Sequence, residues 1–138
     1  MSVLDASVVL KWLVTESDSD KALQLRESSY REREDIVVPD LLLYEAANAL
    51  RYHTDFSADE IKEAIETLFD MGIEIVAPTL SLLKRAIEIA KSEDVTCYDA
   101  IYLALAEDIG DVFVTADEKF ASKLSAGRRK RVVLLKDL

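Results

Sequence analysis

The chain has 138 residues, half of them hydrophobic, with three glycines, two prolines and a formal net charge of −10. This length and composition predict one domain, residues 1–138, with a substantial hydrophobic core and no linker. The negative charge argues against a protein that coats nucleic acid or an anionic membrane, because such a protein needs a broad basic surface.

The first part of the chain alternates between short apolar runs and helical patterns. Val3 and Leu4 read as a buried strand, and the run of mostly apolar residues that follows predicts a helix packed on several sides. The expected elements here are a strand ending at Asp5, helices over residues 6–14 and 18–34, a strand at residues 36–38 closed by Pro39, and a helix over residues 40–52.

The second part begins with a helix-start motif. Ser57 and Glu60, three residues apart, form a capping box that predicts a helix ending near Gly72. The helix after residue 79 is expected to bury an apolar stripe made of Leu80, Leu83, Ile87 and Ala90. From Ala100 to Ala106 every residue is apolar or aromatic, which predicts a helix buried on all sides. Further strands are expected at residues 73–76, 111–114 and 131–135, and a short helix at residues 117–124.

Strands therefore alternate with helices from one end of the chain to the other. This alternation predicts an α/β fold in which a parallel sheet is covered by helices on both faces. In such open sheets, ligands bind beyond the carboxyl ends of the strands. Asp5 and Asp117 both fall at the ends of expected strands, so we expect a site there.

Four acidic residues lie at the ends of apolar segments or interrupt them, namely Asp5, Glu45, Asp99 and Asp117. Carboxylates that converge from separate segments repel one another, so a fold that gathers them usually does so around a hard divalent cation. Without a histidine cluster or a cysteine pair, the set favours magnesium or manganese over zinc. Such ions could lower the pKa of a bound water and align it for attack on a phosphodiester.

Each of these acids also has a structural interpretation. Asp5 or Asp117 could be the N-cap of the helix that follows it. Thr96 and Asp99 fit a second capping box, in which Asp99 would simply start a helix. Glu45 is the hardest to explain in this way, because it interrupts an apolar helix and no basic residue lies four positions on to pair with it.

Other catalytic arrangements find little support in the chain. The only histidine, His53, is expected at a helix end without an associated nucleophile, and no glycine-rich phosphate loop is present. Ser7 and Thr115, each two residues from an acid, could hold a ligand carboxylate or a metal-bound water. Both hydroxyls could equally serve as helix caps.

Four stretches taken together resemble PIN-domain ribonucleases, and most of all the VapC-type toxins of bacterial and archaeal toxin–antitoxin pairs. The stretches are residues 3–13, 39–50, 98–106 and 114–120, which follow one another in the family's order and contain the four acids. The resemblance implies a three-layer αβα, PIN-like fold with a five-stranded parallel sheet in the order 3-2-1-4-5. It also implies a Mg²⁺ or Mn²⁺ site that cleaves RNA.

By position, the resemblance makes Asp5, Glu45, Asp99 and Asp117 the catalytic, metal-binding acids. Ser7, Asn48 and Thr115 would support them. It further implies a homodimer and a small antitoxin protein whose tail enters the acidic groove. Two alternatives stay open, a non-catalytic module of this fold that binds RNA or protein, and a stand-alone nuclease, acting in RNA processing or on DNA flaps.

Phosphate contacts would have to come from local basic residues. The candidates are Lys11, Arg128, Arg129 and Lys130, the last three in a run that continues to Arg131, with Arg31 and Arg33 as weaker ones. Such runs are more often solvated surface.

The single cysteine, Cys97, excludes an internal disulfide framework and fits a reducing compartment. No basic-then-apolar signal region precedes the first strand, and the apolar stretches are too short to span a bilayer. We therefore expect a cytoplasmic protein that does not enter a membrane.

Overall fold

Short parallel strands form one central sheet in the computed structural model, which describes residues 1–53 and 55–138. The strands are β1 (Ser2–Leu4), β2 (Ile36–Pro39), β3 (Glu74–Val76), β4 (Val112–Thr115) and β5 (Val132–Leu134). Their order across the sheet is β3-β2-β1-β4-β5, and every neighbouring pair is parallel. This confirms the α/β fold and the strand order implied by the resemblance.

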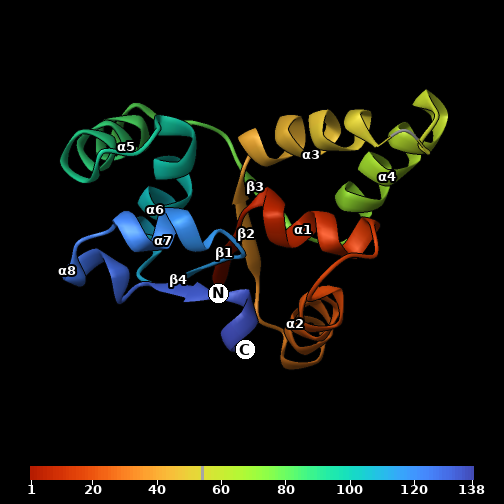
Figure 1. The fold of residues 1–138 in the computed structure, drawn as a ribbon, viewed down its shortest axis with the longest axis horizontal. Helices are drawn as coiled ribbons and strands as arrows, with labels where there is room; N and C mark the ends of the chain where they lie inside the picture. Colours follow the sequence, from red (N-terminus) through yellow and green to blue (C-terminus); the bar gives the residue numbers. More distant parts are fainter. Residues whose placement is uncertain (54) are drawn as a thin grey trace.

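Helices cover both faces of the sheet (Figure 1). On one side lie α1 (Ala6–Leu13), α2 (Ser19–Glu32), α3 (Leu41–Tyr52) and α4 (Ala58–Asp70), and on the other lie α5 (Leu80–Glu93) and α6 (Cys97–Ile109). The shorter elements near the carboxyl terminus are α7 (Glu118–Lys123), α8 (Ala126–Arg129) and the 3-10 turn η1 (Leu135–Asp137). α6 packs directly on β1, β2 and β4, with α5 against its outer side.

The register of the central strands decides where the site can lie. Leu4 pairs with Val114, so the residues that follow β1 stand beside the end of β4. Because all strands run in one direction, their carboxyl ends meet at the same edge of the sheet. We call this edge the carboxyl edge and the opposite one the amino edge.

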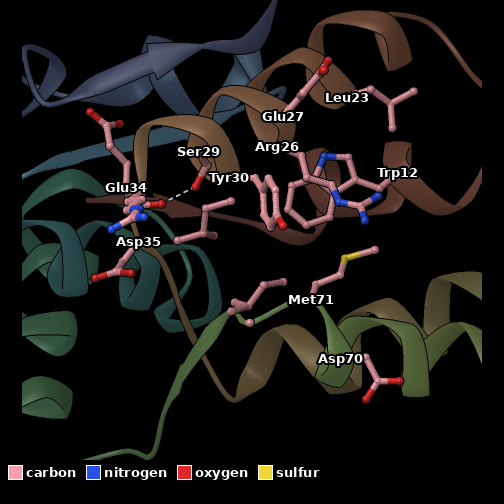
Figure 2. A pocket seen from close by; sticks show the side chains of 14 residues that line it. Trp12, Leu23, Arg26, Glu27, Ser29, Tyr30, Glu34, Asp35, Asp70 and Met71 are labelled. Atoms are coloured by element: carbon pink, nitrogen blue, oxygen red, sulfur yellow. Dashed lines mark hydrogen bonds between the residues drawn. The ribbon is translucent and has the colours of Figure 1, made fainter.

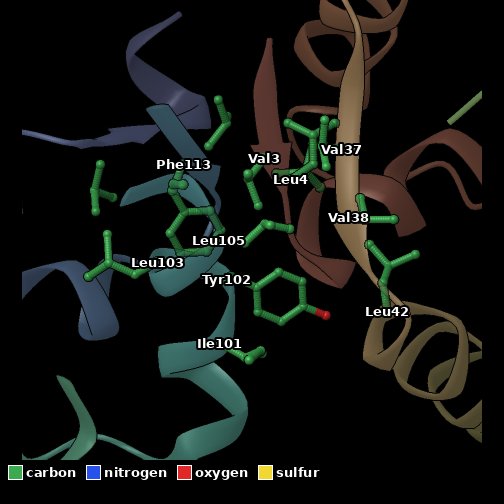
Figure 3. Close-up of a cluster of buried hydrophobic side chains, with 14 of the residues drawn as sticks. Val3, Leu4, Val37, Val38, Leu42, Ile101, Tyr102, Leu103, Leu105 and Phe113 are labelled. Carbon is green, nitrogen blue, oxygen red and sulfur yellow. The ribbon is translucent and has the colours of Figure 1, made fainter. Parts of the chain in front are cut away.

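The core forms between the sheet and the all-apolar helix, as expected. Every residue from Ala100 to Ala106 is buried, and Val3, Leu4 and Leu103 are completely inaccessible. The rings of Tyr102 and Phe113 stack with their centroids 5.7 Å apart, and Figure 3 shows them at the centre of the cluster. This packing fixes α6, and with it Asp99 in its first turn, against the central strands.

Of the four residues expected to form the apolar stripe of α5, only Ala90 packs against the core, and it is partly buried. Leu80, Leu83 and Ile87 are 70%, 44% and 52% exposed, whereas the buried residues of this helix are Leu82, Ala86 and Ile89. Both sets repeat at helical spacing, so the helix has two apolar stripes. Only the packing against α6 determines which of them faces the core.

Helix starts agree with the expected caps in part. Ser57 and Glu60 form the complete capping box at the start of α4. Asp40 takes helical backbone angles and makes no side-chain capping bond, so α3 begins without the expected carboxylate cap. Within the described residues, no helix is long and apolar enough to cross a membrane.

Candidate active site

Asp5 lies at the carboxyl edge, where β1 passes into α1, and its side chain is held by three donors. Oδ1 accepts hydrogen bonds from the Ser7 hydroxyl at 2.5 Å and from the Val8 amide at 3.3 Å. Oδ2 accepts from the Thr115 hydroxyl at 2.5 Å. Asp5 therefore does cap α1, but the hydroxyl from β4 shows that capping is not its whole role.

Backbone amides supply a second hydrogen bond to each of these hydroxyl oxygens. The Ser7 oxygen accepts the amide of Ala116 at 3.0 Å, and the fully buried Thr115 oxygen accepts the amide of Asp117 at 3.0 Å. Each hydroxyl oxygen thus accepts one amide and donates its own proton to Asp5. The arrangement ties the ends of β1 and β4 together and favours an ionised Asp5, which can only accept.

Glu45 projects from α3 and is held by a residue that the sequence analysis did not identify. The Tyr102 hydroxyl donates a hydrogen bond to Glu45 Oε1. Figure 3 shows the Tyr102 ring inside the apolar cluster with its hydroxyl pointing out of it towards α3. Tyr102 is the only polar side chain between Ala100 and Ala106. Because a buried tyrosine hydroxyl usually finds a partner, that position was a usable indication of a nearby acceptor.

Asp99 and Asp117 occupy the starts of α6 and α7. The Thr96 hydroxyl accepts the Asp99 amide at 3.1 Å, which is the threonine half of the expected capping box. Asp117 Oδ1 accepts the Phe120 amide at 2.9 Å, so this acid does cap its helix. Each carboxylate retains at least one oxygen outside these capping bonds, and both line one pocket of about 410 Å³.

The acids influence one another in a continuous series. Burial, and to a smaller extent the charge of Glu45, raises the pKa of Asp5 to about 6, against the opposing effect of the hydroxyl donors. Burial and the charge of Asp99 raise the pKa of Glu45, and burial and the charge of Asp117 raise the pKa of Asp99. Burial and the bond to Glu45 also raise the pKa of Tyr102, which stays a neutral donor. The four acids lie far apart in the sequence, and the fold brings them close enough for their charges to affect one another's pKa.

The four carboxylates share an edge of the sheet but not a single coordination sphere. Among residues 1–53 and 55–138, no three acidic, histidine or cysteine side chains lie close enough to hold one ion together. The donor set nevertheless consists of carboxylate and hydroxyl oxygens, the ligands preferred by magnesium and manganese. His53, at the far end of α3, and Cys97 are exposed and do not bond to these acids. The donor chemistry therefore fits a hard divalent cation, and binding would require the carboxylates to draw together.

The remaining candidate residues lie further out. Asn48 is exposed on α3, one turn beyond Glu45. Lys11 is only 12% exposed in its side chain; its amine donates to the Ser17 carbonyl at 2.7 Å and pairs with Glu16 at 3.4 Å. Lys11 thus fastens the end of α1 to the loop that follows it.

The basic run near the carboxyl terminus lies at the amino edge, because it directly precedes β5. Arg128 bonds to Glu93 and Glu107, each at 3.2 Å, and so ties α8 to α5 and α6. The Arg129 guanidinium donates to the Val132 carbonyl at 2.7 Å. Lys130 is exposed. The structure thus does not bring this run to the acids.

Two basic residues that the sequence analysis passed over do lie beside the acids. Lys119 and Lys123 line the 410 Å³ pocket together with Asp99 and Asp117. The charge of Lys123 acts to lower the pKa of Asp99, against the stronger raising effect of burial. Their spacing of four residues within the short helix after Asp117 was the pattern that could have indicated them.

A larger pocket of about 760 Å³ lies elsewhere (Figure 2). It is lined by Trp12 of α1, by Arg26 and Tyr30 of α2, and by residues just before β2 and β3. The Arg26 guanidinium lies 5.9 Å from the centre of the Trp12 ring. None of the four acids lines it, and the residues before β2 and β3 place it at the amino edge.

Comparisons with known proteins give a consistent result. The sequence pattern of the PIN domain matches residues 2–123. Ribonuclease VapC3 of Pyrobaculum aerophilum is 34% identical over 128 residues, covering 90% of this chain and 95% of its own. The solved structure of the sarcin–ricin loop cleaving toxin VapC20 of Mycobacterium tuberculosis is 16% identical with a TM-score of 0.71, covering 88% of this chain and 94% of its own. A toxin–antitoxin complex from Klebsiella pneumoniae is 15% identical with a TM-score of 0.67, covering 98% of both chains.

Proposed function

Since this chain belongs to the PIN-domain family, among its VapC-type proteins, we propose that it is an endoribonuclease that hydrolyses RNA phosphodiester bonds with Mg²⁺ or Mn²⁺. We infer that residues 1–138 form a single PIN-like nuclease domain. The observation that carries the proposal is that carboxylates from separate segments gather at the carboxyl edge, where burial and, to a smaller extent, repulsion between neighbouring charges raise the pKa values of Asp5, Glu45 and Asp99. A fold that accumulates this repulsion is expected to relieve it with a cation.

We assign the roles by position in this series. Asp5, Asp99 and Asp117 would bind the ion, and Glu45 would bind it or orient the attacking water. A bound divalent ion supplies a water of lowered pKa and charge compensation for the phosphoryl oxygens.

The neighbouring hydrogen bonds keep two of these acids in position. Ser7 and Thr115 hold both oxygens of Asp5 in place, so that this carboxylate is ionised and oriented before a ligand arrives. Tyr102 does the same for one oxygen of Glu45. Supporting bonds of this kind commonly contribute about 10- to 100-fold to metal affinity or activity.

The test is RNA cleavage by Asp5→Asn and Asp99→Asn in Mg²⁺, beside the parent with and without EDTA. We expect the parent to cleave only with the metal and each variant to lose at least about 100-fold in rate. Asp59→Asn is the matched control, because Asp59 is exposed on α4 and its substitution removes one negative charge, as the site variants do. Circular dichroism checks that each variant is folded. Full activity of either site variant would refute the assignment.

We further propose that the protein is a toxin of the cytoplasm that forms a homodimer and is inhibited by a small antitoxin protein. Support comes from the similarity to VapC3 and from the fold shared with the Klebsiella toxin–antitoxin complex. Co-expression with the product of a neighbouring small gene, followed by light scattering of the purified complex, tests both partners. A monomer that such a product neither binds nor inhibits would favour a stand-alone nuclease.

A further inference from the structure

The pocket beside Asp99 and Asp117 has a basic side formed by α7. Lys119 and Lys123 are four residues apart, which places them on one face of the helix, and both are exposed. They line the same pocket as the two acids, yet within the described residues neither amine comes within 4 Å of a carboxylate. The pocket therefore offers two ammonium groups without a direct ion pair, one of which, Lys123, acts on Asp99 through its charge alone.

Several other cationic side chains are already used within the protein. Lys11, Arg128 and Arg129 are bonded to neighbouring carboxylate or carbonyl groups. Lys21 donates to the Lys136 carbonyl, and Arg131 donates to the Asp111 carbonyl. Lys119 and Lys123 thus differ from these residues in being both uncommitted and adjacent to the acids.

An acidic site needs such charges if it is to hold a polyanion. The chain has a net charge of −10, and the four carboxylates at the carboxyl edge would repel every phosphate except one in contact with the cation. The first turn of α6 also opens into this pocket through Thr96, and the positive end of the helix dipole lies there. The pocket thus combines two lysines and a helix start directly beside the proposed metal ligands.

We propose that Lys119 and Lys123 bind a backbone phosphate of the RNA next to the scissile one, and so position the strand across Asp99 and Asp117. This inference rests on the proposed function. A lysine amine acts on phosphate as a point charge, and contacts of this kind fix the position of a strand without reading its sequence. The two lysines are therefore positioning residues, and their loss weakens substrate binding and leaves the chemical step largely intact.

The experiment compares Lys119→Gln, Lys123→Gln and the double variant with Lys62→Gln as a matched control. Lys62 is exposed on α4, on the other side of the sheet, and its substitution removes one positive charge, as each pocket substitution does. With a single-stranded oligoribonucleotide in Mg²⁺, we expect KM to rise roughly 5-fold for each pocket lysine while kcat changes little. The log–log slope of affinity against salt concentration should become shallower by about 0.7 for each phosphate that a lysine no longer neutralises. The control should leave all three quantities unchanged.

Binding is measured separately by fluorescence anisotropy in the Asp5→Asn background, where the RNA stays intact. If the parent does not cleave RNA but the lysine substitutions still weaken binding in the Asp5→Asn variant, the phosphate site is supported and the proposed nuclease activity is refuted. If the parent cleaves and the double variant keeps the parental KM, affinity and salt slope, the phosphate site is overturned. A fall in kcat alone would also overturn it, because the lysines would then act on the reacting groups.

Discussion

At the residue scale, the orientation of Asp5 depends on two hydroxyl groups from different segments. Thr115 is fully buried, donates to Asp5 and accepts the Asp117 amide, so it links two of the proposed metal ligands. Removing this one oxygen leaves an acceptor on Asp5 and a donor on Asp117, both partly buried, without their partner.

We expect Thr115→Val to lower the free energy of unfolding by about 1–2 kcal/mol, because partly buried polar groups that lose their partner retain part of their desolvation cost. Thr115→Ser keeps the oxygen and should lose much less. Urea denaturation of both variants measures the difference. Equal losses would mean that the methyl group, rather than the hydroxyl bonds, accounts for the effect.

The raised pKa of Asp5 predicts a pH dependence of stability in the metal-free protein. The folded-state pKa is about 6 against an ordinary value of 3.8, so the folded state binds more protons than the unfolded chain between these values. The free energy of unfolding therefore falls as pH rises through this window and levels off above about pH 6.

From Asp5 alone we expect the protein to be about 1 kcal/mol more stable at pH 5 than at pH 7. Urea denaturation in EDTA at the two pH values measures this difference. Asp5→Asn removes this contribution, so the variant should show a smaller difference. The same pH dependence in parent and variant would contradict a raised pKa at this residue.

Some site residues could be predicted from the chain alone and others could not. Asp5 and Asp117 follow recognisable strands, and the carboxyl ends of parallel strands share one edge. The partner of Tyr102 lies 57 residues away, on a helix whose orientation no local pattern specifies. The partly buried position of Lys11 likewise depends on the loop that folds back on it.

At the scale of elements, periodicity located the helices but not always their buried faces. α6 could be assigned because all its central residues are apolar, so every face is suited to the core. α5 has two apolar stripes, and the packing of α6 selected the one formed by Leu82, Ala86 and Ile89. The short α8 has four residues and no apolar pattern, and the sequence analysis missed it.

The arginine at the start of the basic run has a structural role that can be tested. Arg128 joins α8 to α5 and α6 through Glu93 and Glu107, and the Glu93 side chain is only 7% exposed. We expect Arg128→Gln to lower the free energy of unfolding by about 1–2 kcal/mol, since it leaves a nearly buried carboxylate without its cation.

Lys130→Gln is the matched control for this prediction, because Lys130 is close in sequence and exposed, and its substitution also removes one positive charge. Its stability should stay within about 0.5 kcal/mol of the parent. Thermal unfolding and RNA affinity are measured on both variants. A loss of RNA affinity in folded Arg128→Gln would restore this run as a nucleic-acid contact.

At the scale of the whole molecule, the strand order came from the resemblance and not from the residues. Alternating strands and helices establish a parallel sheet, but several orders would satisfy the same pattern. The order β3-β2-β1-β4-β5 places β1 and β4 side by side at the centre. On one side of this pair successive strands are added towards β3, and on the other side towards β5, so the strand order reverses here. That topology brings Asp5 next to Thr115 and Asp117, although more than 100 residues separate them in sequence.

Magnesium is expected to stabilise this acidic molecule beyond the general effect of salt. Any ligand that binds only the folded state stabilises it by RT ln(1 + [L]/Kd), so Mg²⁺ at ten times its Kd should add about 1.4 kcal/mol. A net charge of −10 also responds to general screening, and NaCl at matched ionic strength separates the two effects. We expect the melting temperature of the parent to rise well above the NaCl value, and that of Asp117→Asn to follow NaCl alone. Equal shifts in the two salts would mean that magnesium only screens the surface and that the carboxyl edge does not bind it.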